Sequence, residues 1–184
     1  MEGSRGLGDV YKRQALMGVI NGSFDGVRSL SLYMLIYLVM SLALFISIIA
    51  LKNNDEHIEN IEDISGLAKI NPVMALIISI LLFSLAGIPP LAGFFAKFYV
   101  LYAAIDAKLY YLAIFGVLSS VISAFYYLRI IKVMYFEESA NSFDPISNRL
   151  KTIIYLLTAI TLLFFLRPSI FINFAGTASA SLFI

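Results

Sequence analysis

The sequence predicts an all-α protein, a polytopic transmembrane bundle of about four membrane-spanning helices, one of which is discontinuous at residues 87–93. Two observations carry this prediction. The 184 residues are 60% hydrophobic and 14% charged, whereas about 25% of the residues in a typical soluble domain are charged. The apolar residues also form long blocks with at most one charge each, on the scale of the about 20 helical residues that cross a bilayer.

The N-terminal end does not match the rest of the chain. Its first fourteen residues, MEGSRGLGDVYKRQ, are polar and basic, and we expect them to be a non-native head that resembles translated adapter sequence. Residues 15–20 look like the end of an earlier helix. Residues 29–51 then form the first complete predicted span, with 23 uncharged residues that suffice for one tilted helix.

The segment 71–105 is too long for one straight span, because 35 helical residues extend over about 52 Å. It contains Gly87, Pro89, Pro90 and Gly93. Proline removes a backbone donor and interrupts a helix, so we predict two helical pieces that meet at these residues. A break of this kind is tolerated inside a membrane where it is buried in protein or lines a water-filled cavity.

Two further spans follow. Residues 109–128 are uncharged and end at Arg129. Residues 152–166 offer only 15 uncharged residues, about 22 Å of helix. This last segment spans the bilayer if the flanking basic side chains extend to the membrane surface, or if the helix continues past Pro168.

Lys97 is a charge inside the discontinuous span. It follows 27 uncharged residues and precedes eight more, and a charge at that depth costs about 3 kcal/mol. Such residues are usually kept for a function and face a protein interior or a wet cavity. The alternative is a lysine near the end of a helix that extends to the membrane surface, since Asp106 follows soon after.

The composition limits the kinds of binding site that this chain can form. The absence of cysteine excludes disulfides and iron–sulfur ligation by this chain. The single histidine, His57, lies in an acidic segment and is better explained as a solvated loop residue than as a metal ligand. We therefore predict neither a metal site nor a cofactor site. The 13 lysines and arginines are dispersed along the chain, which argues against a surface for nucleic acid.

The positive-inside rule orients the predicted spans. It places loops 52–71 and 137–151 in the cytoplasm. Without the head and Lys97, six basic residues lie on that side and three on the other. The six are Lys52, Lys69, Arg129, Lys132, Arg149 and Lys151; the three are Arg28, Lys108 and Arg167.

The segment GLAKINPVMALIISILLFSLAGIPPLAGFFAKFYVLYAAI, residues 66–105, closely resembles subunit N of the bacterial NADH–quinone oxidoreductases, respiratory complex I. The resemblance continues through SAFYYLRIIKVMYF (123–136) and upstream through LYMLIYLVMSLALF (32–45). In the sister subunit M a glutamate is typical at the lysine position, and in subunit L acidic residues follow the lysine. The sequence Lys97-Phe98-Tyr99 is similar to the N type.

This resemblance implies that residues 15–184 are the C-terminal part of an antiporter-like, proton-translocating membrane domain. It implies that Lys97 is the proton-relay lysine of the broken helix and that Pro89 is the proline of the break. It makes Tyr126 a candidate for the proton path. For Tyr126 the alternative is an ordinary tyrosine at the membrane interface.

The function that the resemblance implies is that of a membrane-arm subunit, which conducts protons across the bacterial inner membrane as part of an enzyme complex. NADH, FMN, the iron–sulfur clusters and quinone would be handled by other subunits. The expected partners are other membrane-arm subunits and the lipid bilayer. Two alternatives remain: a subunit of a multi-subunit Na⁺/H⁺ antiporter, and an anchor in a membrane-bound hydrogenase-type complex.

Overall fold

The computed structural model describes residues 24–53, 56–138 and 143–166. The predicted head, the predicted helix end at residues 15–20 and the continuation past Pro168 lie outside these residues. The described chain is helical, as predicted. Its five longer helices are α2 (Phe24–Ala50), α4 (Pro72–Ala86), α5 (Ala92–Asp106), α6 (Tyr110–Phe136) and α7 (Asn148–Leu166).

The connection between α2 and α4 holds short elements. Strand β1 (Lys52–Asn53) pairs antiparallel with β2 (Glu56–His57). The 3₁₀ helix η1 (Ile61–Ile64) and the one-turn helix α3 (Leu67–Ile70) follow. This connection packs against the end of α6, where the Gly66 amide donates to the Val133 carbonyl over 3.3 Å.

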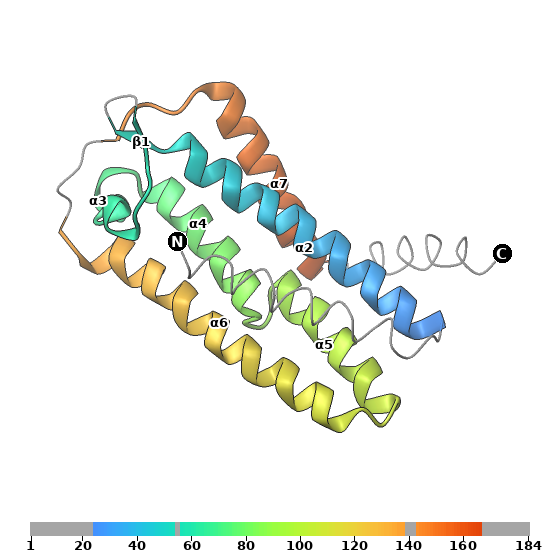
Figure 1. Cartoon of the computed structure of the whole chain (residues 1–184). Helices are drawn as coiled ribbons and strands as arrows, with labels where there is room; N and C mark the ends of the chain where they lie inside the picture. Colours follow the sequence, from blue (N-terminus) through green and yellow to red (C-terminus); the bar gives the residue numbers. More distant parts are fainter. Residues whose placement is uncertain (1–23, 54–55, 139–142, 167–184) are drawn as a thin grey trace.

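The long helices form three layers (Figure 1). Helices α4 and α5 lie end to end in the middle layer. Helix α2, with α7 beside it, covers one side, and α6 covers the other. The side chain of Lys97 therefore lies in the layer that is enclosed from both sides.

The predicted discontinuity is confirmed: α4 ends at Ala86 and α5 begins at Ala92. The end of α4 is a Schellman motif. Gly87 adopts a left-handed conformation with φ of 85°. Its amide donates to the Ser84 carbonyl over 3.0 Å, and the Ile88 amide donates to the Phe83 carbonyl over 3.1 Å. The glycine permits this conformation at little cost because it has no Cβ.

Two helices extend beyond the uncharged segments that were predicted to cross the bilayer. Helix α6 continues to Phe136 and so includes Arg129 and Lys132, because a charged residue marks the edge of an apolar run and does not stop a helix. Helix α7 begins at Asn148, four residues before the uncharged segment 152–166. The Ser147 hydroxyl accepts a hydrogen bond from the Leu150 amide over 3.4 Å. Ser147 thus caps the first turn of α7, which lies in polar sequence.

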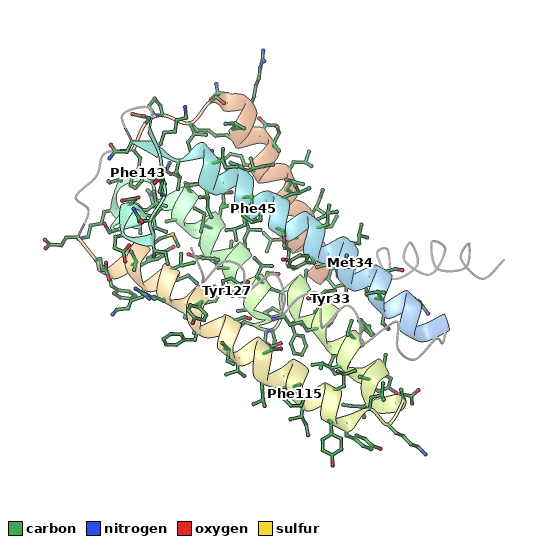
Figure 2. All side chains as sticks on the ribbon, in the orientation of Figure 1. Tyr33, Met34, Phe45, Phe115, Tyr127 and Phe143 are labelled. Carbon is green, nitrogen blue, oxygen red and sulfur yellow. The ribbon has the colours of Figure 1, made fainter. Side chains whose placement is uncertain are left out.

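The outward faces of the helices are apolar. Met34, Phe45 and Phe115 point away from the bundle (Figure 2), and 50%, 62% and 68% of their respective surfaces are exposed. Among the described residues, α2 from Arg28 to Ala50 and the whole of α6 are each long and apolar enough to cross a bilayer alone. Helix α4, with 15 residues, is shorter and reaches that length together with α5.

Candidate functional site

Lys97 lies in the second turn of α5 on its buried side. Only 9% of its surface is exposed. Its Nζ donates a hydrogen bond to the carbonyl of Ala86, the last residue of α4, over 3.2 Å. Asp106, at the end of the helix, lies nine positions after Lys97, about 14 Å along the axis. The ammonium group therefore reaches back into the helix break and away from the membrane surface.

The end of α4 is a suitable place for a buried cation. The last four carbonyls of a helix have no partner within it, and they form the negative end of the helix dipole. The Schellman motif satisfies the carbonyls of Phe83 and Ser84, while Lys97 satisfies that of Ala86. The break thus supplies the electrostatic partner that a lysine needs inside a bilayer.

Gly87 borders the lysine stem directly. A Cβ added at Gly87 would lie 3.1 Å from Lys97 Cδ and 3.6 Å from both Cε and Nζ. Glycine at this position therefore meets two requirements, the left-handed turn and the room for the aliphatic part of Lys97.

Gly93 allows the two half-helices to cross closely. A Cβ at Gly93 would collide with the Ser84 carbonyl and would lie 3.4 Å from Met40 Cε. At the same point the Gly93 amide donates to Ser84 Oγ over 3.1 Å. The Ser84 hydroxyl in turn donates to Met40 Sδ on α2 over 2.9 Å. Backbone contact and side-chain hydrogen bonds thus join α4, α5 and α2 beside the break.

A small cavity of about 10 Å³ adjoins Lys97 and Gly93, close to the lower limit of the space that one water molecule needs. Its wall toward α2 consists of Tyr33, Tyr37 and Met40. The rings of Tyr33 and Tyr37 are parallel, with centroids 6.1 Å apart. Lys97 therefore shares the wall of this cavity with aromatic side chains from the neighbouring helix.

The structure brings some of the predicted site residues together and leaves others apart. Lys97, Gly87 and Gly93 lie together. Pro89 and Pro90 are exposed in the turn between the half-helices. Their predicted roles stay predictions.

Tyr126 is 45% exposed and packs its ring edge against Phe125. Its neighbour Tyr127 is 7% exposed instead. Tyr127 is labelled in Figure 2. The part of Tyr126 in the proton path stays a prediction.

Sequence reasoning missed Ser84 and Met40. Ser84 had a weak signal, since it is a polar residue in an apolar run shortly before Gly87. Met40 had none, because its contact depends on how α2 packs on α4, and the two residues in contact lie 44 positions apart in the chain. Tyr33 and Tyr37 also went unnoticed among the other aromatic residues of the first span.

The chemistry that this arrangement permits is proton binding. A lysine amine takes up and releases a proton, and the carbonyl at the end of α4 holds the charged form in place. Within the described residues, no three His, Cys, Asp or Glu side chains group as a metal site requires.

Comparisons with known proteins agree with this geometry. Residues 14–123 match the sequence profile of a family described as NADH:quinone oxidoreductase/Mrp antiporter, transmembrane. NADH-quinone oxidoreductase subunit N 1 of Rhizobium meliloti (strain 1021) is 55% identical over 140 residues, which are 76% of this chain and 29% of that protein. Subunit N of Pelagibacter ubique (strain HTCC1062) is 52% identical over 156 residues, 84% of this chain and 33% of that protein. The chain spans about a third of the length of these curated relatives.

Solved structures share the fold. A chain of the Mrp complex from Dietzia sp. DQ12-45-1b superimposes with a TM-score of 0.75 at 24% identity, covering 90% of this chain and 39% of that one. A chain of respiratory complex I from Thermus thermophilus superimposes with a TM-score of 0.73 at 21% identity, covering 87% of this chain and 36% of that one. The profile matches more than half of the chain. The chain is therefore an integral membrane protein that belongs to the NADH:quinone oxidoreductase/Mrp antiporter transmembrane family.

Proposed function

We propose that this chain is part of a membrane-arm subunit of a proton-pumping NADH–quinone oxidoreductase. In this function the subunit conducts protons across the bacterial inner membrane, with loops 52–71 and 137–151 in the cytoplasm. The buried Lys97, whose amine meets the end of α4 at the helix break, is the observation that carries the proposal. The curated relatives named as subunit N support it.

The proposed role of Lys97 is to bind a proton and pass it on. In the charged state its hydrogen bond to the Ala86 carbonyl is charge-assisted, and it weakens when the amine becomes neutral, because charge-assisted hydrogen bonds are about twice as strong as neutral ones. The contact between α4 and α5 then changes with the protonation of Lys97. Tyr126 keeps its proposed place in the proton path.

The redox chemistry is assigned to other subunits. NADH, FMN, the iron–sulfur clusters and quinone would bind there, in keeping with the absence of cysteine from this chain. The proposed partners are the other membrane-arm subunits and the surrounding lipid. On this proposal the chain takes part in catalysis only within the assembled complex.

A subunit of a multi-subunit Na⁺/H⁺ antiporter is the second candidate. The family description covers both kinds of complex, and the fold superimposes as well on a chain of the Mrp complex as on one of complex I. Proton movement that requires Na⁺ and does not require electron transfer would favour this second function.

The test replaces Lys97 in the full-length protein within its assembled complex. We expect Lys97→Ala to lower the number of protons translocated per electron at normal assembly, because the titratable group is gone. Lys97→Arg should impair translocation as well, because guanidinium stays protonated at any accessible pH. The measurement is proton translocation per electron in membrane vesicles, with Lys132→Ala as the control, since Lys132 is an exposed lysine near the end of α6.

A lysine that merely extends to the membrane surface would give a different result. Arginine would then replace it without loss, and proton translocation would follow the amount of assembled complex. Normal protons per electron in Lys97→Arg would rule out Lys97 as a group that must release its proton.

A further inference from the structure

The start of α5 lacks a cap from its own residues. Leu91, which precedes the helix, offers no side-chain hydrogen bond. The first amides of a helix need partners from outside its ladder, and this need is strict in a membrane. The Gly93 amide finds its partner on another helix, in Ser84 Oγ at 3.1 Å. Ser84 therefore acts as a cap that α4 supplies to α5.

Ser84 is fully buried, and both functions of its hydroxyl are used. The oxygen accepts from Gly93, and the proton is donated to Met40 Sδ on α2. Its backbone carbonyl lies so close to Gly93 that no Cβ fits between them. This one residue thus fixes where the first turn of α5 lies against α4 and α2.

The position of Lys97 depends on that turn. Lys97 follows Gly93 by four residues, so the two lie on the same face of α5, one turn apart. Ser84 and Ala86 both lie in the last turn of α4. Two links therefore join the half-helices, an uncharged one from Ser84 to Gly93 and a charged one from Ala86 to Lys97. The first sets the geometry in which the second forms.

We propose that Ser84 is a positioning residue for Lys97, which holds the start of α5 so that the lysine amine meets the carbonyl end of α4. Met40 extends this link to α2. The inference rests on the proposed function, since it assigns Ser84 a part in the proton transfer of Lys97.

The experiment compares Ser84→Ala with Ser79→Ala in the full-length protein within the assembled complex. Ser79 is a matched control because it is also buried on α4. Among the residues that the structure describes, its hydroxyl bonds only within its own helix, to the Ala75 carbonyl at 2.7 Å. The Lys97-dependent pumping is the pumping of the unaltered complex minus that of Lys97→Ala. We expect Ser84→Ala to lower it by about tenfold, since a displacement of about 1 Å at a reacting group can cost up to about a hundredfold. Ser79→Ala should leave it unchanged.

Two further variants distinguish positioning from packing. Cysteine is only slightly larger than serine and keeps a weaker donor and acceptor, so Ser84→Cys should retain part of the pumping that Ser84→Ala loses. In the double variant Ser84→Ala/Lys97→Ala, the serine change should lower protons per electron no further, because a residue that acts through Lys97 has no effect once Lys97 is gone. Should Ser84→Ala fail to assemble, Ser84→Cys alone and combined with Lys97→Ala gives the same comparison.

The outcomes separate the two proposals. Normal pumping in Lys97→Ala would refute the proposed function itself. Reduced pumping in Lys97→Ala with normal pumping in Ser84→Ala would overturn only the positioning role. A loss in Ser84→Ala that is repeated in full in the Lys97→Ala background would also overturn it.

Discussion

At the scale of single residues, Gly87 shows how tightly the surroundings of Lys97 are determined. Its φ of 85° is unfavourable for other residues, by about 1–2 kcal/mol. Its Cα also faces the stem of Lys97, so a methyl group would crowd Cδ at 3.1 Å. Backbone strain and contact with the lysine are two separate reasons for glycine here.

These reasons lead to a prediction for two variants of Gly87. Gly87→Ala should destabilise the protein by about 1–2 kcal/mol through strain and should also lower proton translocation through crowding. Gly87→Asn should destabilise it less, because asparagine tolerates the left-handed region, while translocation falls at least as much. The measurements are the thermal denaturation midpoint of the full-length protein in detergent and protons per electron in the complex. Equal translocation in both variants and the unaltered protein would contradict the crowding argument.

The sequence predicted Lys97, Gly87 and Gly93 because their signals are local. A charge in an apolar run, and glycines next to prolines in a segment too long for one span, need no knowledge of neighbouring helices. The hydrogen bond between Ser84 and Met40 could not be found in this way, since it arises from packing between α4 and α2. The choice between Tyr126 and Tyr127 is of the same kind. Adjacent residues point about 100° apart on a helix, and only the packing decides which of them faces inward.

At the scale of elements, length and composition predicted which segments are helices, and local capping decided where they end. The discontinuous span was predictable because 35 helical residues exceed the thickness of a bilayer. The extension of α6 past Arg129 was not, since its last turns lie against η1 and α3. There Arg129 and Glu62 approach to 3.8 Å, an exposed pair whose contribution to stability is small.

Helix α7 packs on α2 through a buried face that includes two threonines. The Thr161 hydroxyl donates to the Leu157 carbonyl over 3.0 Å. The Thr158 hydroxyl, within the part of the chain that the structure describes, is buried with no hydrogen-bond partner. A buried polar group without a partner destabilises the folded state.

We therefore predict opposite effects for two isosteric changes in α7. Thr158→Val should stabilise the protein by about 1 kcal/mol, because it removes an unsatisfied hydroxyl and keeps the shape. Thr161→Val should be neutral or slightly destabilising, since it removes a hydroxyl that has a hydrogen-bond partner. The measurement is the thermal denaturation midpoint of each full-length variant in detergent, compared with that of the unaltered protein. A lower midpoint for Thr158→Val than for Thr161→Val would be the contrary result.

At the scale of the whole molecule, the bundle has two ends of different character. The connection from α2 to α4 and the start of α7 lie at one end, together with the end of α6 (Figure 1). They are joined there by a hydrogen bond from the Asp144 amide to the Lys52 carbonyl over 2.9 Å. The turn between α5 and α6, with Lys108, lies at the opposite end. The two loops that the charge distribution assigned to one side of the membrane thus lie at one end of the bundle.

The final prediction concerns which end faces the cytoplasm. Basic residues are enriched at the end that carries Lys69, and basic loops remain on the cytoplasmic side. The chain contains no cysteine, so single-cysteine variants need no further change in this part of the protein. Lys69 and Lys108 are both exposed and lie at opposite ends.

In intact cells with a permeable outer membrane, a membrane-impermeant maleimide should label Lys108→Cys and spare Lys69→Cys. In inverted vesicles the pattern should reverse, because the cytoplasmic face is then outside. Labelling of Lys69→Cys in intact cells would mean that the orientation is inverted, and labelling of both from one side would mean that the two ends do not lie across a bilayer from each other.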